Sequence, residues 1–200
     1  VERMGITWLG RWTRSFRQIT NSKTPVNSPD DLKGMVLRTP SNSLYTEYFT
    51  ACGATATPMN FSEVYNALQL NTLDGQENPV DVPATNNFYE VQKYISGTNH
   101  IADAWVVGMN TAKLTGLSQN QQDALRKAAE ECQQWYVDYQ AEKDGEMLKL
   151  LTDNGMEYNE VPEDGFQKFV EISQGLYPKF KELVANDELF EATTAFCGKS

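Results

Sequence analysis

Arg38 has the clearest potential for chemistry, because it lies within a short apolar segment, KGMVLRTP. A charge among apolar neighbours is costly unless a partner of opposite sign neutralises it. A guanidinium is always charged, and its fork of donors fits a carboxylate at two points, so an anionic ligand is one candidate partner. The alternative, of equal weight, is a salt bridge within the protein to Asp30, Asp31 or Glu63. The sequence therefore predicts either carboxylate binding or an internal ion pair.

Three further residues are candidates for the same site. Arg17, in the segment SFRQ, could supply a second positive contact, although the neighbouring Arg11 and Arg14 favour a solvated basic cluster. Asn78 lies in a predicted turn before a proline and can donate a side-chain N–H to a carboxylate oxygen. Phe61 precedes a helix and is either a flat surface for a ligand or, at about two to one, a core residue.

The sequence contains little that could catalyse a reaction or bind a metal ion. Its one histidine, His100, excludes a histidine-rich metal site, and we expect a structural residue bonded to the backbone. Asp74 and Glu77 lie in a predicted polar turn, where carboxylates are usually solvated or cap the chain. The motifs GxSxG, GxGxxG and CxxC and a phosphate loop are absent from the sequence. We therefore expect no catalytic residue, no metal and no cofactor.

The composition limits the possible partners. The chain has 200 residues, an apolar share of 40% and a formal net charge of -10. The apolar share is typical of a folded protein, and the negative charge argues against nucleic-acid binding, which needs a basic face. No uncharged stretch is long enough to span a membrane. The three cysteines are too scattered for a disulfide scaffold, so we expect buried small side chains at Cys52, Cys132 and Cys197.

Capping and turn signals divide the first half of the chain into alternating helices and strands. Ser28-Pro29 begins a short helix that Gly34 ends, and Asp74-Gly75 marks a tight turn. Alternation of this kind favours a mainly parallel sheet with helices on both faces. We expect strands over 35–38, 54–58, 94–95 and 105–109, and helices over 42–52 and 63–70.

The second half is predicted to be mostly helical. A capping box at Ser118 begins a helix that meets no strong breaker until Asn154-Gly155. At about 1.5 Å per residue, this helix would be about 50 Å long and would bridge two lobes. A strand over 156–161 and a helix over 166–183, bent at Pro178, are expected to follow. The apolar stripe of the long helix is expected to consist of Leu125, Ala128, Cys132, Trp135 and Tyr139.

Four segments closely resemble the solute-binding subunits of TRAP transporters, the DctP-type family: SFRQITNSKTP, SPDDLKGMVLRTP, GATATPMNFSEVYNALQLNTLDGQENP and NFYEVQKYISGTNH. The resemblance continues through LSQNQQDALRKAAEE and covers most of the chain. It implies an α/β, periplasmic-binding-protein-like (type II-like) lobe, with a mainly parallel central sheet flanked by helices and a long bridging helix. Residues 15–103 and 144–200 would form the second lobe, which binds the ligand carboxylate. Residues 1–14 and 104–143 would be the bridging helix and a remnant of the first lobe, whose N-terminal part this chain would lack.

The resemblance also implies roles for the candidate residues. The family's selectivity-filter arginine falls on Arg38, within GMVLRTP, and a second arginine of many members falls on Arg17. The ligand-contacting asparagine of the GQEN turn falls on Asn78, and the pocket phenylalanine of the PMxFSEVY pattern falls on Phe61. Some acidic-sugar binders carry an asparagine after the RxP triplet, where this chain has Ser41, so the ligand subclass stays open.

The resemblance implies a receptor function. Family members are periplasmic receptors that close on an organic acid and deliver it to integral membrane TRAP permease subunits. For this chain it implies a periplasmic, non-enzymatic receptor for a uronate or other sugar acid, a dicarboxylate or a keto acid. The alternative is an extracytoplasmic organic-acid sensor domain that reports to a signalling protein. Neither function requires a cofactor or nucleic acid.

Overall fold

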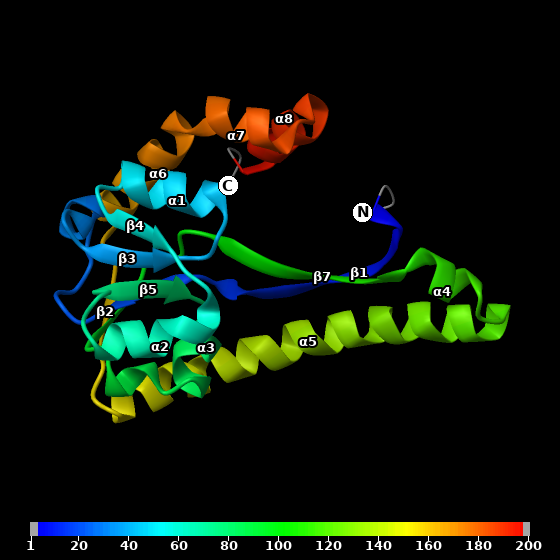
Figure 1. Cartoon of the computed structure of the whole chain (residues 1–200), viewed down its shortest axis with the longest axis horizontal. Coiled ribbons are helices and arrows are strands. Elements are labelled where there is room, and N and C mark those ends of the chain that lie inside the picture. The colour runs from blue at the N-terminus through cyan, green and yellow to red at the C-terminus, as the bar shows by residue number, and fades with distance from the viewer. Residues whose placement is uncertain (1–3, 198–200) are drawn as a thin grey trace.

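Two sheets organise the protein in the computed structural model, which describes residues 4–197 (Figure 1). A six-stranded sheet has the order β4-β3-β5-β2-β6-β8, and a two-stranded ribbon pairs β1 with β7. Within residues 4–197 no helix combines the length and the apolar character that a membrane span needs. The strands are β1 (Ile6–Phe16), β2 (Gln18–Asn21), β3 (Val36–Thr39), β4 (Thr55–Pro58), β5 (Gly75–Asn78), β6 (Tyr94–Gly97), β7 (Ala102–Asn110) and β8 (Glu157–Glu160).

The six-stranded sheet is mixed, with most strands in one direction. β3 pairs in parallel with β4 and β5, and β6 pairs in parallel with β8. Only β2 runs the other way, antiparallel to both β5 and β6. It follows β1 almost without interruption, whereas the other strands return to the sheet through helices, and a helical crossover is what parallel pairing requires. The expected mainly parallel sheet is confirmed, and β2 is its exception.

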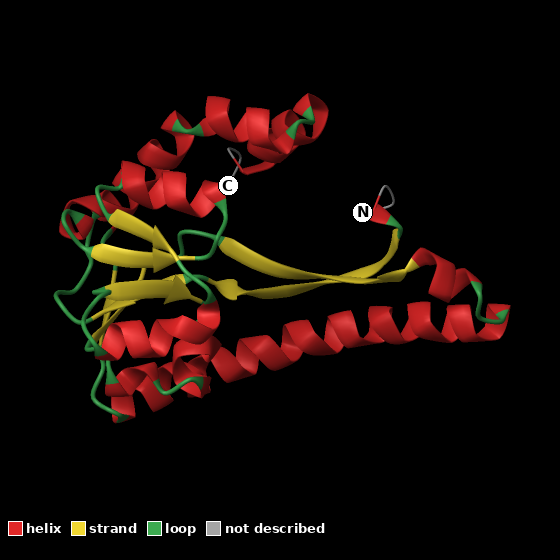
Figure 2. Ribbon diagram, in the orientation of Figure 1, coloured by secondary structure: helices red, strands yellow, loops and turns green. Residues whose placement is uncertain are grey.

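Helices cover both faces of this sheet, as Figure 2 shows. On one face α1 and α6 pack against β3, with Phe49, Phe169 and Leu37 in the shared core. On the other face α2, η3, α3 and the C-terminal end of α5 bury Phe88 and Leu151. The helices are η2 (Pro29–Leu32), α1 (Ser43–Ala51), α2 (Phe61–Gln69), α3 (Asp81–Thr85), η3 (Phe88–Glu90), α4 (Thr111–Thr115), α5 (Gln119–Asp153), α6 (Glu163–Gly175), α7 (Tyr177–Val184) and α8 (Asp187–Cys197).

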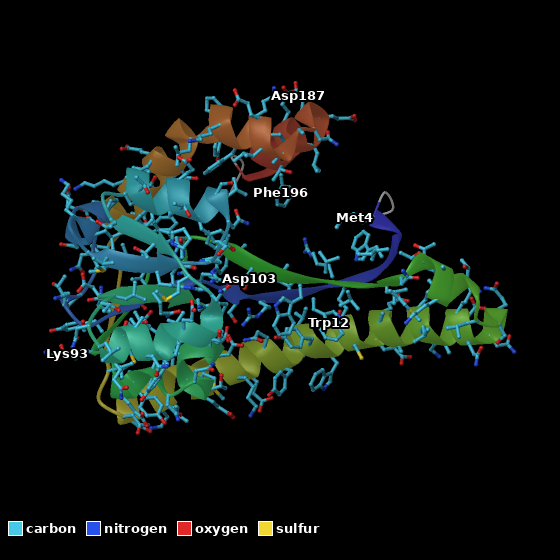
Figure 3. The ribbon with its side chains drawn as sticks, in the orientation of Figure 1. Met4, Trp12, Lys93, Asp103, Asp187 and Phe196 are labelled. Carbon is cyan, nitrogen blue, oxygen red and sulfur yellow. The ribbon has the colours of Figure 1, made fainter. Side chains whose placement is uncertain are left out.

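An arm made of β1, β7, α4 and the N-terminal part of α5 projects from the sheet (Figure 1). The β1–β7 ribbon lies along α5, and Trp12 stacks on Tyr136 with ring centroids 5.8 Å apart (Figure 3). The backbone N–H of Arg11 donates to the Gln133 side chain over 3.1 Å. These contacts fix which side of α5 meets the ribbon.

The apolar stripe expected along α5 lies on the wrong side of that helix. Trp135 is 60% exposed and Tyr139 is 39% exposed, whereas Ala129 is buried at 8%. The helix turns Ala129 and Tyr136, seven residues apart, toward the ribbon. Helical periodicity therefore predicted the helix correctly. The prediction that its most apolar face is the buried face was wrong. Cys132 on the stripe is exposed, contrary to the expected burial, while Cys52 is buried as expected. The side chain of Cys197 lies outside the described part of the structure.

The turn expected over Asp74–Pro79 is a central strand, β5, and this prediction was wrong. All four of its residues are buried, and it lies between β2 and β3. A Cβ at Gly75 would lie 2.4 Å from the Thr20 carbonyl oxygen, so the close approach of β5 to β2 requires glycine there. Polar side chains are rare in central strands. Here they bond to one another, with the Gln76 amide donating to the Thr20 hydroxyl over 2.9 Å.

The end of the chain follows the expected helix with one break. The predicted bend near Pro178 appears as the boundary between α6 and α7 at Leu176, because proline occupies the first turn of α7. The sequence did not reveal α8, which packs on α7 through an edge-to-face contact between Tyr177 and Phe190, 5.7 Å apart.

Candidate functional site

Arg38 is a buried cation without a carboxylate partner in the described part of the chain. Its side chain lies at the C-terminal end of β3 and the residue is 5% exposed. Its Nε and Nη2 donate to the Met59 carbonyl oxygen over 3.0 and 2.7 Å. Burial lowers the pKa of Arg38, and the nearby charge of Arg17 lowers it further against the opposing effect of Glu77. A bound anion would reverse this penalty.

The internal salt bridge considered for Arg38 is absent, so that alternative was wrong. Asp30 instead pairs with Lys33 and Lys168 at the surface. The Asp31 carboxylate accepts hydrogen bonds from the backbone N–H groups of residues 27 and 28. It forms the capping box that begins η2. Glu63 lies in the first turn of α2, and none of the ion pairs among the described residues joins it to Arg38.

Arg17, at the junction of β1 and β2, is almost fully neutralised within the protein. Its Nε and Nη2 donate to the two Glu77 carboxylate oxygens over 2.5 and 2.9 Å. Its Nη1 lies 3.1 Å from Asp103, and its Nη2 also donates to the Asn78 side chain over 2.8 Å. Burial opposes the charge, but the hydrogen bond and charge of Glu77 raise the pKa of Arg17. The interpretation of a solvated basic cluster was wrong for this residue.

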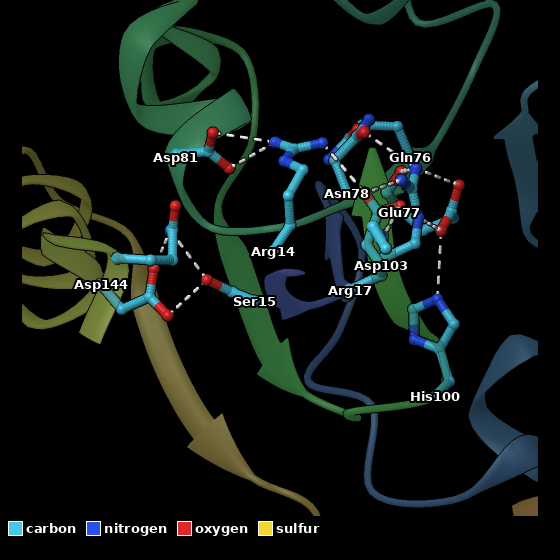
Figure 4. Close-up of polar contacts among 12 residues, drawn as sticks. Arg14, Ser15, Arg17, Gln76, Glu77, Asn78, Asp81, His100, Asp103 and Asp144 are labelled. Carbon is cyan, nitrogen blue, oxygen red and sulfur yellow. Dashed lines mark hydrogen bonds and ion pairs between the residues drawn. The ribbon is translucent and has the colours of Figure 1, made fainter. Parts of the chain in front are cut away.

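The same ion-pair network continues through Arg14 (Figure 4). Arg14 donates to both Asp81 carboxylate oxygens over 2.9 and 2.8 Å and to Asp103 over 2.9 Å. Asp103 therefore bridges the two arginines, and its side chain is 15% exposed. Its position, at the start of β7, links the six-stranded sheet to the arm. Asp103 could not be selected from the sequence, because its two partners, Arg14 and Arg17, are more than 80 residues away in the chain.

His100 completes the network on the other side of Glu77. Its Nε2 lies 3.1 Å from a Glu77 oxygen, and its Nδ1 lies 2.7 Å from the Thr98 hydroxyl. Burial lowers the pKa of His100, although Glu77 opposes this effect. The ring is therefore neutral, with Nε2–H donating to Glu77 and Nδ1 accepting from Thr98. His100 is structural, as expected, but its partners are side chains rather than the backbone.

Neutral burial of His100 predicts a pH dependence of stability. A histidine whose pKa is lowered by folding stabilises the protein above its unfolded pKa of about 6.5, and this contribution is lost as the pH falls. We expect the free energy of unfolding to decrease below pH 6.5 by up to about 1.4 kcal/mol per pH unit. Denaturant unfolding between pH 5.5 and 7.5, in parallel with His100→Gln, measures the effect. Because His100 is the single histidine, an equal dependence in both proteins would refute this assignment.

Asn78 contacts Arg17, and Phe61 contacts Arg38. The Asn78 side-chain Oδ1 accepts from Arg17, and its Nδ2 donates to the Gln76 side chain over 2.6 Å. Asn78 ends a buried strand rather than lying in a turn, and one of its two N–H donors remains available. Phe61 is 42% exposed, so the favoured core interpretation was wrong. Its ring centroid is 5.8 Å from the Arg38 guanidinium carbon, which favours the alternative of a flat surface beside the cation.

Topology brings these residues together. Arg38 and Asn78 lie at the C-terminal ends of two parallel neighbouring strands, β3 and β5. Arg17 lies next to both because Gln18 pairs with Asn78 in the β2–β5 register. Ser41 is exposed in the loop before α1, and no described hydrogen bond ties it to this group. The chemistry offered is a buried guanidinium with further N–H donors nearby, which suits a carboxylate.

Comparison with known proteins gives a consistent picture. Residues 1–183 match the family model DctP, bacterial extracellular solute-binding protein, family 7. The 2,3-diketo-L-gulonate-binding periplasmic protein YiaO of Escherichia coli K12 is 36% identical over 78% of this chain and 48% of that protein. The sialic acid-binding periplasmic protein SiaP of Vibrio cholerae is 34% identical over 86% of this chain and 52% of that protein.

Structural comparison agrees. A TRAP periplasmic solute-binding protein from Sulfitobacter sp. NAS-14.1 with bound β-D-galacturonate superimposes with a TM-score of 0.87 and 30% identity. The match covers 95% of this chain and 62% of that chain, and this chain spans about half the length of the two curated relatives. These relatives are binding proteins, and the sensor alternative finds no support among them. The chain belongs to the DctP family of bacterial extracellular solute-binding proteins.

Proposed function

We propose that this protein is a periplasmic receptor that captures a small organic acid and delivers it to the membrane permease of a TRAP transporter. One observation carries the proposal. Arg38 is buried, it bonds to a backbone carbonyl oxygen, and no described carboxylate neutralises it. Burial of an unpaired charge costs free energy that only an anionic partner can offset. The proposed receptor binds its ligand without chemical conversion.

The proposed ligand carboxylate binds the unoccupied edge of the Arg38 guanidinium. Glu77 and Asp103 neutralise most of the charge of Arg17. Arg17 therefore contributes to the site one N–H group that is not bonded to the described part of the protein, and these ion pairs hold that group in place. Asn78 supplies its second amide hydrogen, and Phe61 covers one side of the ligand. The whole site has one uncompensated cation, which suits one carboxylate group. Uronates and other sugar acids, dicarboxylates and keto acids all carry this group.

We further propose how the chain divides between two lobes. Residues 15–103 and 144–200 form the carboxylate-binding lobe, and residues 1–14 and 104–143 belong to the other lobe and the bridging helix. Support comes from the arm, which projects from the six-stranded sheet (Figure 1), with Asp103 at the start of its strand β7 and Asp144 in α5. There the Asp144 carboxylate bonds to Ser15 and Gln140, which ties α5 to β1. Ligand binding would favour a closed arrangement of the lobes through contacts that the open form lacks.

Ligand-induced stabilisation tests the proposed function. We expect at least one acid from a panel of uronates, dicarboxylates and keto acids to raise the unfolding free energy. At about 100 times the dissociation constant, the increase should be about 2.7 kcal/mol. Thermal unfolding with each acid, beside Arg38→Gln as a variant without the cation, provides the measurement. A panel in which no acid stabilises the protein, or one that stabilises both proteins equally, would contradict the proposal.

A further inference from the structure

Asp103 is an additional carboxylate in the ion-pair network. Its Oδ2 accepts from Arg14 Nη1 over 2.9 Å and from Arg17 Nη1 over 3.1 Å. Each of these arginines also has a carboxylate of its own. Asp81 binds Arg14 through both of its oxygens, and Glu77 binds Arg17 through both of its oxygens. Two cations therefore face three carboxylates, which leaves a surplus negative charge beside Arg17.

The Asp103 carboxylate is held in place and is open to solvent. Its Oδ1 accepts from the Ala104 backbone N–H over 2.9 Å, while its Oδ2 bonds to the two arginines (Figure 4). The Asp103 side chain is 15% exposed, whereas the Glu77 side chain is fully buried. Of the two carboxylates that bind Arg17, Asp103 is therefore the one that a ligand can approach.

The free N–H group of Arg17 lies beside this carboxylate. Nε donates to Glu77, and Nη2 donates to Glu77 and to the Asn78 side chain. Nη1 has two hydrogens but a single partner among the described residues, which is Asp103. A trigonal nitrogen separates its two hydrogens by about 120°, so an acceptor on the free one would lie about 5 Å from Asp103 Oδ2.

Side-chain contacts connect Arg17 with the face of the sheet that carries Arg38. Arg17 Nη2 donates to Asn78 Oδ1 over 2.8 Å, and Asn78 Nδ2 donates to Gln76 Oε1 over 2.6 Å. Gln76 is the register partner of Arg38 in the parallel pair of β5 and β3. Side chains that are aligned on neighbouring strands, or two residues apart on one strand, share a face of the sheet. Arg38, Gln76 and Asn78 therefore lie on one face, and Arg17 contacts it at its edge.

Resting on the function proposed above, we propose that Asp103 is a specificity residue that excludes a second carboxylate from the ligand site. The ligand class is then an acid with a single carboxylate and a neutral hydroxyl or keto oxygen. The carboxylate binds Arg38, and the neutral oxygen accepts the free Nη1–H of Arg17. The surplus charge of Asp103 makes this N–H group unsuitable for a second anion.

The size of the discrimination follows from the repulsion between two like charges. At a separation of about 5 Å, this repulsion weakens binding about fourfold in bulk water and more than about 100-fold at the effective dielectric constant near a protein surface. Asp103 is 15% exposed and lies between these limits, so we expect a discrimination of at least about tenfold. Arg17 offers little attraction in return, because Glu77 already neutralises it.

Calorimetric titration of the purified protein with two matched pairs of acids tests this inference. The pairs are gluconate with glucarate and 4-hydroxybutanoate with succinate. In each pair a terminal CH₂OH group is replaced by a carboxylate, and the rest of the molecule stays the same. In at least one pair we expect the monoacid to bind to the wild type, and to bind at least about tenfold more tightly than its diacid.

Asp103→Asn identifies the cause of this preference. The amide keeps the size of the side chain and an oxygen for the arginines, but it removes the charge. The diacid should bind about tenfold more tightly to this variant than to the wild type, and the monoacid should change by less than about threefold. Arg14 and Arg17 keep Asp81 and Glu77 as partners, so the variant should fold, and denaturant unfolding checks this.

Asp153→Asn is the matched control for this substitution. Asp153 also pairs with a cation, Lys149 at 2.7 Å, but it lies at the C-terminal end of α5 with its side chain 60% exposed. The same chemical change at this position should leave the preference between monoacid and diacid unaltered. An equal shift in both variants would mean that the net charge of the protein, and not Asp103, causes the preference.

The outcomes separate this inference from the proposed function. A wild type that binds a diacid as tightly as its monoacid, or an Asp103→Asn variant that weakens both acids equally, overturns the role of Asp103 and leaves the receptor function intact. The same holds if none of the four acids binds while another acid of the wider panel does, because the ligand class is then wrong. If no acid of the wider panel binds either, the receptor function and the role of Asp103 are both wrong.

Discussion

Arg38→Lys is expected to weaken binding of the organic acid by two to three orders of magnitude. Removing the cation of a buried charge pair altogether costs about 3–5 kcal/mol, or about two to nearly four orders of magnitude in affinity, and the loss expected for lysine lies in the lower part of that range. Lysine keeps the charge but has neither the planar fork nor the reach to bond the Met59 carbonyl oxygen and a carboxylate together. In the protein, two Arg38 nitrogens share the Met59 oxygen at 3.0 and 2.7 Å. That contact orients the guanidinium before any ligand arrives.

Stability provides the second half of this test. Arg38 has no described carboxylate partner, so Arg38→Lys and Arg38→Gln should unfold at nearly the free energy of the wild type or slightly above it. Loss of binding with unchanged unfolding would place the effect in the site rather than in the fold. Calorimetric titration and denaturant unfolding of the same preparations measure both quantities.

The matched control is Arg126→Lys, at an exposed position on α5. It makes the same chemical change at a distance from the site and should alter neither binding nor stability. Wild-type affinity in Arg38→Lys would show that a point charge suffices and that the two-pronged arrangement has no role. A parallel fall in affinity and stability would show instead that Arg38 supports the fold.

Arg38 and the long helix illustrate what the sequence could predict. The apolar segment around Arg38 made burial a direct expectation, and burial is what the structure has. The capping box at Ser118 and the absence of breakers predicted α5 to within a residue at each end. Both depend on local signals, which a single sequence contains.

Glu77 shows why the rest of the site was not predictable. In the sequence it follows Asp74-Gly75-Gln76, a polar run typical of a turn. In the structure it is fully buried, and the partner that makes its burial possible, Arg17, lies one residue before the neighbouring strand β2. Only the register of β2 on β5, which opposes Gln18 to Asn78, brings the two charges together. Pairing between strands that are distant in sequence produces no periodic pattern of residues in either segment, so it could not be predicted from the sequence.

Glu77→Gln is expected to lower the free energy of unfolding by about 3–5 kcal/mol. The substitution keeps the shape of the side chain but removes the negative charge that faces the Arg17 guanidinium and replaces one acceptor oxygen with a donor. Arg17 would then be a buried cation that shares a single carboxylate, Asp103, with Arg14. A loss of this size is a large part of the 5–15 kcal/mol that stabilises a typical domain, so denaturant unfolding would detect it readily.

Glu157→Gln is the control for this substitution. Glu157 also pairs with a cation, Lys93 at 3.4 Å, but its side chain is 62% exposed. Exposed pairs contribute about 0–1 kcal/mol, so this change should be almost neutral. The contrast between the two substitutions isolates burial as the cause, since the chemical change is the same. Equal, small effects would show that water reaches Glu77 and that the network is not a buried one.

A double substitution decides whether Arg17 is the reason for the loss. In Arg17→Met/Glu77→Gln the cation that Glu77 neutralises is gone as well, so the double variant should lose clearly less than the sum of the two single losses. Strict additivity would mean that Glu77 acts through His100 or through packing alone. Coupling would instead mean that Glu77 holds a cation next to the ligand site while cancelling most of its charge. Arg38 would then be the cation of the proposed site that is not neutralised by the protein and is available to the carboxylate of the acid.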